Sequence, residues 1–417
     1  MVYFTGFSLS SPGKFHLEVH LQIVQPCEAG MSREQLNLRK FVAPEFIYGS
    51  GARLLAGNIV FRLGVKKILL VSDPGVHKAG WVNEIMHSLR EAGLKYVYFD
   101  QVSPNPRDSE VMHCAETYLQ NHCEAIVAVG GGSPMDLAKG AGIVASNRKN
   151  ILEFEGIDQV EVPSPPLICI PTTAGSSADV SQFAIINDSS RQVKIAIVSK
   201  AVVPDMALID PQTTLTMDQE LTAATGMDAL THAVEAYVSL ASSSISDVHA
   251  LEAIRLVNEN IVACVQNPDS IYYRDRLMLA SLHAGLAFSN AILGAVHAMA
   301  HSLGGLMDLP HGLCNALLLS HVVDFNFDSA WERYLNIART MGIDTQGKTP
   351  EEIRPLLKTA LIQLHRQAGL TSTLGSMGLE KEMVARLAEN AVNDPCMLTN
   401  PKPMSAQDVQ EIYLKSI

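Results

Sequence analysis

Five side chains in the second half of the sequence have the types and spacings of metal ligands. Asp228 and His232 are four residues apart, so on a helix both side chains would point from one face. His297 and His301 repeat this spacing, and His311 follows in a turn flanked by proline and glycine. Carboxylate and imidazole groups without a thiolate bind a range of divalent cations. The cluster therefore predicts a metal site built from nitrogen and oxygen ligands.

The same residues argue against one class of zinc enzyme. A metalloprotease of the H-E-x-x-H type has a glutamate directly after the first histidine of the pair, and here that position is Ala298. One carboxylate with three neutral imidazoles would leave a divalent cation with net positive charge. Such a cation is a Lewis acid that can bind and polarise an alcohol oxygen. A single histidine on a helix is more often packed or solvated, so this interpretation depends on the cluster.

A glycine-rich turn in the first half is typical of phosphate binding. Gly130, Gly131, Gly132 and Ser133 close an apolar, strand-like run and open a helical one. Glycine lets the backbone approach a pyrophosphate, and the free N–H groups at the start of a helix attract the anion. The turn is not the G-x-G-x-x-G fingerprint. A simple connection between strand and helix is therefore the alternative.

Two further features favour a dinucleotide. Asp73 follows the first expected parallel strand, where a carboxylate can accept a hydrogen bond from a ribose 2′-hydroxyl and repel a 2′-phosphate, which favours NAD over NADP. The alternative is a plain Asp-Pro-Gly turn. The hydroxyl-rich loop 171–177 also follows an apolar run, and it either lines phosphates or ribose or is a solvated turn.

The segments that carry these residues change character along the chain. From Lys66 to about Asp210, short apolar runs alternate with amphipathic stretches around 79–92 and 108–121, which predicts a parallel α/β sheet. After Pro211, alanine, leucine and methionine dominate and the apolar period is helical. The expected strands are 67–72, 95–99, 125–129, 167–170, 193–198 and 207–209.

A chain of 417 residues is longer than one hydrophobic core comfortably serves, so we expect more than one domain. Residues 1–30 show no helical or strand period and are expected to be an N-terminal extension without fixed structure, with Met31 as the original start. An ordered arm used in assembly is the alternative. The predicted domains are a dinucleotide-binding α/β domain at 31–214 and an all-helical, metal-binding catalytic domain at 215–417.

Charge and cysteine content narrow the class of partner and the compartment. The net charge is −12, from 43 acidic and 31 basic side chains, and such a surface repels phosphate backbones and anionic lipid. We therefore expect neither nucleic acid nor membrane as a partner. The seven cysteines are scattered and form no C-x-x-C pair, which favours the reducing cytoplasm.

From about Met31 to the C-terminus the chain resembles the iron-containing (group III) alcohol dehydrogenase family. The motifs that carry the resemblance are GGGSPMDLAK at 130–139, PTTAG at 171–175, GMDALTHAVEAY at 226–237, and VHAMAHSLGG with LPHG within 296–312. The resemblance implies a dehydroquinate synthase-like fold, with a Rossmann-like α/β domain followed by a helical domain. It also implies an oxidoreductase that uses NAD and Fe²⁺ and assembles as a homodimer or a larger homo-oligomer.

The resemblance also assigns roles to individual residues. The implied metal ligands are Asp228, His232, His297 and His311. The implied cofactor contacts are Asp73, Asn105, Gly131, Gly132, Ser133, Asp136, Thr172, Thr173 and Lys194. Phe288 and Cys396 are expected to line the substrate pocket. His301 is expected to relay a proton near the reacting centre, and a merely supporting histidine is the alternative.

The sequence departs from the family pattern at two places. The common continuation of PTTAG, T-G-S-E-V-T, is replaced by S-S-A-D-V-S at 176–181, and the proline of the family's HPLG stretch is Ser302. The first departure is expected beside cofactor and substrate, and it resembles the ErcA-like alcohol dehydrogenase-like regulatory subgroup. It therefore affects the expected substrate class more than the expected metal or fold.

The function predicted from these observations is hydride transfer between a small alcohol or aldehyde and NAD(H), with a divalent cation polarising the oxygen. Two alternatives stay open: a catalytically weak regulatory protein of alcohol oxidation, and a glycerol-type polyol dehydrogenase with zinc. Imidazole and carboxylate ligands accept iron, zinc, manganese and nickel alike, so the ligand set does not select the metal.

Overall fold

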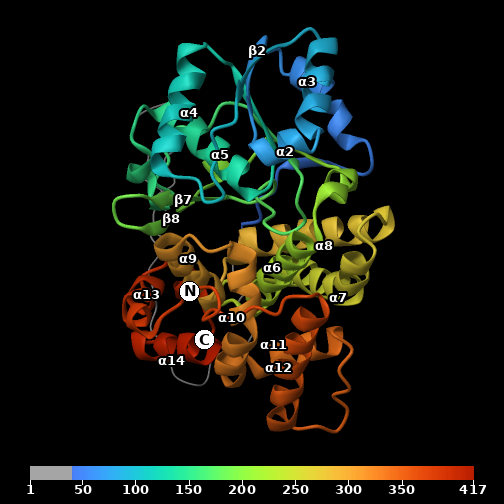
Figure 1. Cartoon of the computed structure of the whole chain (residues 1–417), viewed down its shortest axis with the longest axis vertical. Helices are drawn as coiled ribbons and strands as arrows, with labels where there is room; N and C mark the ends of the chain where they lie inside the picture. The colour runs from blue at the N-terminus through green and yellow to red at the C-terminus, as the bar shows by residue number, and fades with distance from the viewer. Residues whose placement is uncertain (1–39) are drawn as a thin grey trace, which may run out of the picture. The chain divides into compact units, whose positions relative to one another are not determined.

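The computed structural model describes residues 40–417, and Val42–Ile417 forms one compact unit. The predicted extension at 1–30 lies outside the described residues. Within the compact unit, strands and helices alternate up to Ile209, and helices follow to the end of the chain. Figure 1 shows the strands with α2 to α5 in one half of the view and the helices from α6 onward in the other.

Six parallel strands form the main sheet, in the order β1-β9-β6-β4-β2-β3. The central strand has the sequence AIVAVG and is buried along its whole length, as a strand covered on both faces requires. The six strands are β1 (Glu45–Tyr48), β2 (Lys67–Val71), β3 (Lys95–Phe99), β4 (Ala125–Gly130), β6 (Leu167–Pro171) and β9 (Met206–Ile209).

Alternate residues of the strands build two separate cores. Ile68 and Leu70 of β2 pack with α1 (Ala56–Arg62) and α3 (Trp81–Glu91) on one face. Leu69 and Val71 pack on the other face, in the core that includes α4 (Asp108–Gln120) and α5 (Gly132–Asn147). A short helix, α2 (Pro74–Lys78), follows β2. Helices on both faces of a parallel sheet confirm the predicted α/β class.

A second sheet was not expected from the sequence. The run 193–198 is a strand, as predicted, but it pairs antiparallel with β7 instead of joining the parallel sheet. Three strands were not predicted: β1 is a partly exposed edge strand, β5 has only two residues, and the short apolar run of β7 (FAII) was overlooked. The strands of this sheet are β5 (Gly156–Ile157), β7 (Phe183–Asp188) and β8 (Val193–Val198).

Residues 210–417 contain no strand, which confirms the predicted helical character of this half. Among the described residues no single helix has the length and hydropathy to cross a bilayer; α8 and α9, bent by 99°, meet that criterion only as a pair, by length and composition. The helices are α6 (Gln219–Val238), α7 (Ser244–Gln266), α8 (Ile271–Ala291), α9 (Ala295–Met307), α10 (His311–Asn326), α11 (Trp331–Thr340), α12 (Pro350–Gln367), α13 (Val384–Val392) and α14 (Ala406–Ser416).

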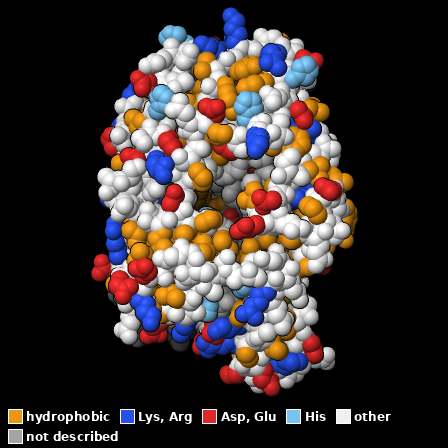
Figure 2. Space-filling view, viewed as in Figure 1, with side chains coloured by type: hydrophobic (Ala, Val, Ile, Leu, Met, Phe, Trp, Pro, Cys, Tyr) orange, Lys and Arg blue, Asp and Glu red, His pale blue; other side chains and the backbone are white. Residues whose placement is uncertain are grey.

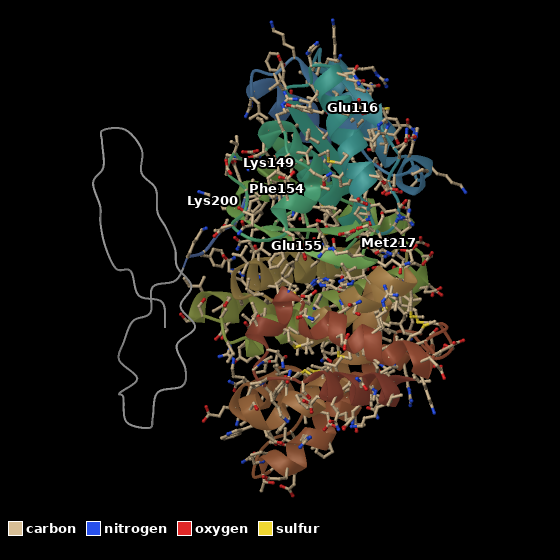
Figure 3. The ribbon with its side chains drawn as sticks, turned by 90° about the vertical axis from the view of Figure 1, so that its left-hand side faces the viewer. Glu116, Lys149, Phe154, Glu155, Lys200 and Met217 are labelled. Atoms are coloured by element: carbon tan, nitrogen blue, oxygen red, sulfur yellow. The ribbon has the colours of Figure 1, made fainter. Side chains whose placement is uncertain are left out.

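The parallel sheet brings distant candidate residues to one edge. β2, β4 and β6 run in the same direction, so Asp73, Gly131 and Thr172, which follow them, emerge at the same end. In open α/β sheets, ligands bind at the carboxyl ends of the strands. The 3₁₀ helix η4 (Pro211–Thr216) lies beside that edge, where Oγ1 of Thr213 donates to the carbonyl oxygen of Pro171. Met217, which follows η4, lies between the two halves (Figure 3).

Helix α9 makes a close approach to β8. A Cβ on Gly305 would lie 2.8 Å from the Cα of Val193, a contact that the backbone cannot tolerate. A Cβ on Gly304 would lie 2.7 Å from the Cε of Lys194, which is the flexible end of a side chain. The glycine pair of the VHAMAHSLGG motif therefore lets a histidine-bearing helix lie against the second sheet.

Replacing Gly305 by alanine is expected to destabilise the protein. Overpacking against backbone atoms costs about 1–3 kcal/mol, so the thermal unfolding midpoint of Gly305→Ala falls by several degrees. Gly304→Ala is the matched control, because it makes the same change in the same helix but meets only the movable Lys194 side chain. Equal midpoints for the two variants would contradict this account of the helix–sheet contact.

Candidate active site

Helices α6, α9 and α10 bring the predicted metal ligands together. The Oδ1 atom of Asp228 lies 4.0 Å from Nε2 of His232, 3.7 Å from Nε2 of His297 and 3.9 Å from Nε2 of His311. These distances are too long for hydrogen bonds, and they are short enough for several atoms to share one ion. One ligand atom each from Asp228, His297 and His311 lies within 4.8 Å of the others.

His232 completes the arrangement from one side. Its ring stacks on that of His297 with centroids 4.4 Å apart, and on that of Phe288 at 4.3 Å. The side chains of Asp228, His232 and His297 are at most 5% exposed, whereas His311 is 28% exposed. The cluster is therefore closed on three sides and open beside His311.

The charges in the cluster suit a cation. Burial opposes ionisation of Asp228, but the neighbouring histidines outweigh it and hold the pKa of this carboxyl below its usual range. Burial lowers the pKa of His232 to about 3 and that of His311 well below its usual value. Asp228 is thus ionised and these two imidazoles are neutral, as metal ligands must be. The donor set fits a divalent cation.

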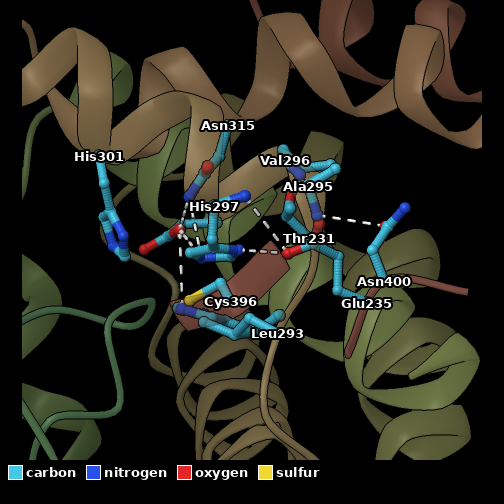
Figure 4. A network of polar contacts seen from close by, with 12 residues as sticks. Thr231, Glu235, Leu293, Ala295, Val296, His297, His301, Asn315, Cys396 and Asn400 are labelled. Atoms are coloured by element: carbon cyan, nitrogen blue, oxygen red, sulfur yellow. Dashed lines mark hydrogen bonds and ion pairs between the residues drawn. The ribbon is translucent and has the colours of Figure 1, made fainter. Parts of the chain in front are cut away.

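Glu235 is a further residue of the site that the sequence analysis did not single out. Its carboxylate accepts a hydrogen bond from the backbone N–H of Val296 at 2.6 Å and lies 2.6 Å from Nδ1 of His297 (Figure 4). Burial lowers the pKa of His297, but Asp228 and Glu235 outweigh it and raise that pKa to about 9, so a cation bound here would displace a proton from this ring. Glu235 fixes the ring of His297 with Nε2 facing Asp228. Its position within GMDALTHAVEAY, three residues after His232, was the available signal.

Asn315 is the second residue that was missed. Its Nδ2 donates to Oδ1 of Asp228 at 2.7 Å and lies 3.1 Å from Nε2 of His297 and 3.2 Å from Nε2 of His311. It follows His311 by one helical turn on α10, so the two side chains share a face. The amide therefore orients the carboxylate from within the cluster. An asparagine four residues after a candidate ligand was the signal in the sequence.

His301 lies next to the cluster and is held by a second carboxylate. Its Nδ1 lies 2.8 Å from Oδ2 of Asp394, and its ring stacks on that of His311 at 5.3 Å. Asp394 also accepts from the backbone N–H of Cys396 at 2.8 Å, where it begins a short 3₁₀ helix, η7 (Pro395–Thr399). The ring nitrogen of His301 that does not face Asp394 is therefore the one available to a bound molecule.

Cys396, which the resemblance places in the substrate pocket, has its sulfur within 4.8 Å of a ring nitrogen of His301 and a carboxylate oxygen of Asp394. The thiol is fully buried behind His301 and is not among the residues that line the cavity. Asp394 turns the chain into η7 at this point, which directs Cys396 into the helical core. Burial raises the pKa of Cys396 well above its usual value, which favours the thiol over the nucleophilic thiolate.

One cavity of about 680 Å³ joins the candidate residues of both halves. Figure 2 shows the surface hollowed between the two halves. The wall of the cavity contains every predicted cofactor residue, together with Phe288, His301 and the four candidate metal ligands. The cofactor residues in the wall are Asp73, Asn105, Gly131, Gly132, Ser133, Asp136, Thr172, Thr173 and Lys194.

At the end of the cavity that carries the candidate cofactor residues, Asp73 and the glycine turn each have a structural role as well as a place in the cavity wall. Asp73 caps α2 by accepting from the backbone N–H of Val76 at 3.0 Å, so the Asp-Pro-Gly turn exists while the side chain still lines the cavity. A Cβ on Gly131 would lie 3.2 Å from the side chain of Thr173, so glycine keeps this turn narrow. Burial raises the pKa of Asp136 to about 6, with Lys139 opposing.

The loop that departs from the family pattern is divided between cavity and core. Ser176, Ala178 and Ser181 line the cavity, whereas Ser177 does not. Ser177 has a φ of 51°, and its Oγ donates to the carbonyl oxygen of Ser281 at 2.6 Å. The serine at position 177 thus anchors the loop to α8. The departure changes the cavity wall at 176, 178 and 181, beside the expected cofactor.

A cavity that runs from a glycine-rich turn to a buried carboxylate–imidazole cluster is what a metal-dependent oxidoreductase requires. The chain belongs to the iron-containing alcohol dehydrogenase family, because the model described as "Iron-containing alcohol dehydrogenase" matches residues 43–211 and the one described as "Fe-containing alcohol dehydrogenase family, C-terminal" matches 222–417. The predicted family, fold class and enzyme class are confirmed, and the protein is an alcohol dehydrogenase.

Relatives and solved structures agree with this assignment. The chain is 36% identical to the NAD-dependent methanol dehydrogenase of Bacillus methanolicus, over 90% of this chain and 99% of that one. It is 39% identical to the 1,3-propanediol dehydrogenase of Citrobacter freundii, over 88% and 95%. A crystal structure of 1,3-propanediol oxidoreductase has a TM-score of 0.88 at 37% identity, covering 91% and 100%. Sulfoacetaldehyde reductase of Bifidobacterium kashiwanohense, in complex with NAD⁺, has a TM-score of 0.81 at 27% identity, covering 91% and 99%.

Removing the charge of Glu235 is expected to weaken metal binding. In Glu235→Gln the amide cannot accept from both Val296 and His297 as the carboxylate does, and loss of such a support costs about 10–100-fold in metal affinity. Competition with a chelator of known affinity measures the change. Glu220→Gln is the control, since it makes the same substitution on the exposed first turn of α6. Unchanged affinity in Glu235→Gln would contradict the supporting role.

Proposed function

We propose that this alcohol dehydrogenase oxidises a small alcohol, or reduces the corresponding aldehyde, with NAD(H), and that it holds one ferrous ion through Asp228, His232, His297 and His311. The observation that carries the proposal is the ring of three imidazole nitrogens 3.7–4.0 Å from one carboxylate oxygen at the end of a dinucleotide-sized cavity. A divalent cation held there would supply Lewis acidity toward an alcohol oxygen.

Side chains of the chain itself would position the substrate and move its proton. Phe288 and Phe183, whose ring centroids are 5.6 Å apart, give the metal end of the cavity an apolar wall. This wall would exclude water from the reacting carbon and favour a short alkyl chain. His301 is our candidate for proton transfer, because it lines the cavity while Asp394 holds its Nδ1.

The cofactor end of the proposal has separate support. The glycine turn 130–132 opens α5, whose first N–H groups suit a pyrophosphate, and Lys194 lines the cavity between that turn and the metal ligands. Burial lowers the pKa of Lys194, with several acidic groups opposing. A nicotinamide cofactor would supply the hydride acceptor. The names of the Bacillus methanolicus and Bifidobacterium kashiwanohense proteins also favour NAD.

The proposal also covers the domain division, the cellular compartment and the oligomeric state. The last strand ends at Ile209 and α6 begins at Gln219, which supports a division between domains 31–214 and 215–417. The six described cysteines are free and buried, which supports a reducing compartment such as the cytoplasm. A homodimer or a larger homo-oligomer rests on the family resemblance alone, and light scattering of the purified protein would establish it.

Turnover is expected to require iron bound by the histidine cluster. Protein reconstituted anaerobically with Fe²⁺ should reduce NAD with at least one short alcohol, and His297→Ala should lose both bound iron and activity, because it removes one ligand and the imidazole partner of Glu235. His87→Ala, at a side chain that is 67% exposed on α3, is the control. Binding of NAD and iron without turnover of any alcohol would overturn the enzymatic proposal and favour the regulatory alternative.

Asp73 is expected to select NAD over NADP. In Asp73→Ser the side-chain oxygen can still cap α2, but the charge that would repel a 2′-phosphate is gone. The ratio of kcat/KM for NADP to kcat/KM for NAD should therefore rise by about tenfold or more, the factor that corresponds to about 1.4 kcal/mol. Asp73→Asn retains the shape of the side chain and should behave in the same way. An unchanged ratio in both variants would remove Asp73 from the cofactor site.

A further inference from the structure

A four-residue loop, Pro104–Arg107, crosses the nucleotide end of the cavity. Pro104, Asn105 and Pro106 line the cavity. The loop is held from the α/β half at two points: Ser133 Oγ donates to the carbonyl oxygen of Pro104, and the backbone N–H of Asn187 donates to that of Pro106 at 2.8 Å. Its two ends are therefore fixed to elements of the sheet half.

The middle of the loop is held from the other half of the molecule. The Nδ2 atom of Asn105 donates to Oδ1 of Asp308, a residue 203 positions further along the chain. The guanidinium of Arg107 lies 3.7 Å from Oδ2 of the same carboxylate. Asn105 is only 7% exposed, so its amide has lost most of its contact with water and depends on this acceptor.

Asp308 has an unusual backbone for its residue type. It ends α9 with a φ of 57°, in the left-handed region that usually carries glycine at the end of a helix. Aspartate is tolerated there at a cost that glycine does not have. The backbone position alone would favour glycine, but glycine would lack the contacts that this carboxylate makes to Asn105 and Arg107. Asp308 also lies three residues before His311 and thus joins the loop to the segment that carries a candidate metal ligand.

We propose that Asp308 is a positioning residue that holds the Pro104–Arg107 loop over the bound cofactor, so that release of the dinucleotide requires the Asn105–Asp308 hydrogen bond to break. This inference rests on the proposed use of NAD(H) in the cavity. Through Asn105, which lines the cavity, the carboxylate connects the half that carries the candidate cofactor residues with the half that carries the candidate metal ligands. Its contribution therefore lies in the residence time of the cofactor, and the chemistry at the metal end does not involve it.

The test compares NADH release from the iron-loaded wild-type protein, Asp308→Gly and Asp308→Asn by stopped-flow fluorescence. In Asp308→Gly the release rate constant should rise about tenfold, the factor expected for losing a hydrogen bond to a charged acceptor. Its thermal unfolding midpoint should change little, because the gain from glycine in a left-handed backbone offsets the loss of the acceptor for Asn105. Asp308→Asn keeps an acceptor for Asn105 and tolerates that backbone, so its release rate should stay close to wild type.

A double-mutant cycle with Asn105→Ala separates this contact from a general effect on the cavity. Asp308→Gly should have a clearly smaller effect on release once Asn105 is alanine, because only the ion pair with Arg107 is then left to lose. An equal effect in both backgrounds, or an unchanged release rate in Asp308→Gly, would overturn the inference while leaving the proposed function intact. Failure of the wild-type protein to bind NADH would overturn the proposed function, and this inference with it.

Discussion

The buried carboxylate of Asp228 is the constraint on which the helical half depends. A charge that is 95% shielded from water is costly unless polar partners surround it, and here these partners come from three helices. His232 is on the same helix, His297 on α9, and His311 with Asn315 on α10. The helices must therefore converge at one point. A Cβ on Gly312 would lie 2.6 Å from the carbonyl oxygen of Ala224, so glycine allows α10 to start against α6.

Two further carboxylates orient the two histidines of α9. Glu235 faces Nδ1 of His297 and Asp394 faces Nδ1 of His301, and the two histidines are one turn apart. Each carboxylate thereby fixes which ring nitrogen points to the cavity. The same helix lies against β8 through its glycine pair, which brings Lys194 beside it. One helix thus places a candidate ligand, a candidate proton carrier and a candidate cofactor contact relative to one another.

The predictable part of the site was the part encoded in local spacing. The i, i+4 pairs of Asp228 with His232 and of His297 with His301 predict shared helix faces, and the structure brings them to one cavity. Glu235 and Asn315 were missed because each faces a residue on another helix. The sequence shows that Glu235 shares α6 with His232 and that Asn315 shares α10 with His311. It does not show that both side chains reach His297 on α9. The position of Cys396 likewise depends on how η7 turns the chain, which the sequence does not show. The same limit applies to the fold, where β8 has strand-forming residues but its antiparallel partner depends on tertiary pairing.

In the altered loop after PTTAG, Ser177 stands where the family pattern has glycine, and a glycine on α8 makes room for it. Ser177 carries a left-handed backbone that glycine would adopt at less cost, and a Cβ on Gly285 would lie only 2.5 Å from the Cβ of Ser177. The glycine on α8 leaves room for the serine, and the bond to Ser281 offsets part of the strain. This substitution therefore fixes the loop to the helical half without reaching the cavity. Within this loop, the positions that can affect the substrate are those that do reach the cavity, Ser176, Ala178 and Ser181, which lie in the same wall as the candidate metal ligands.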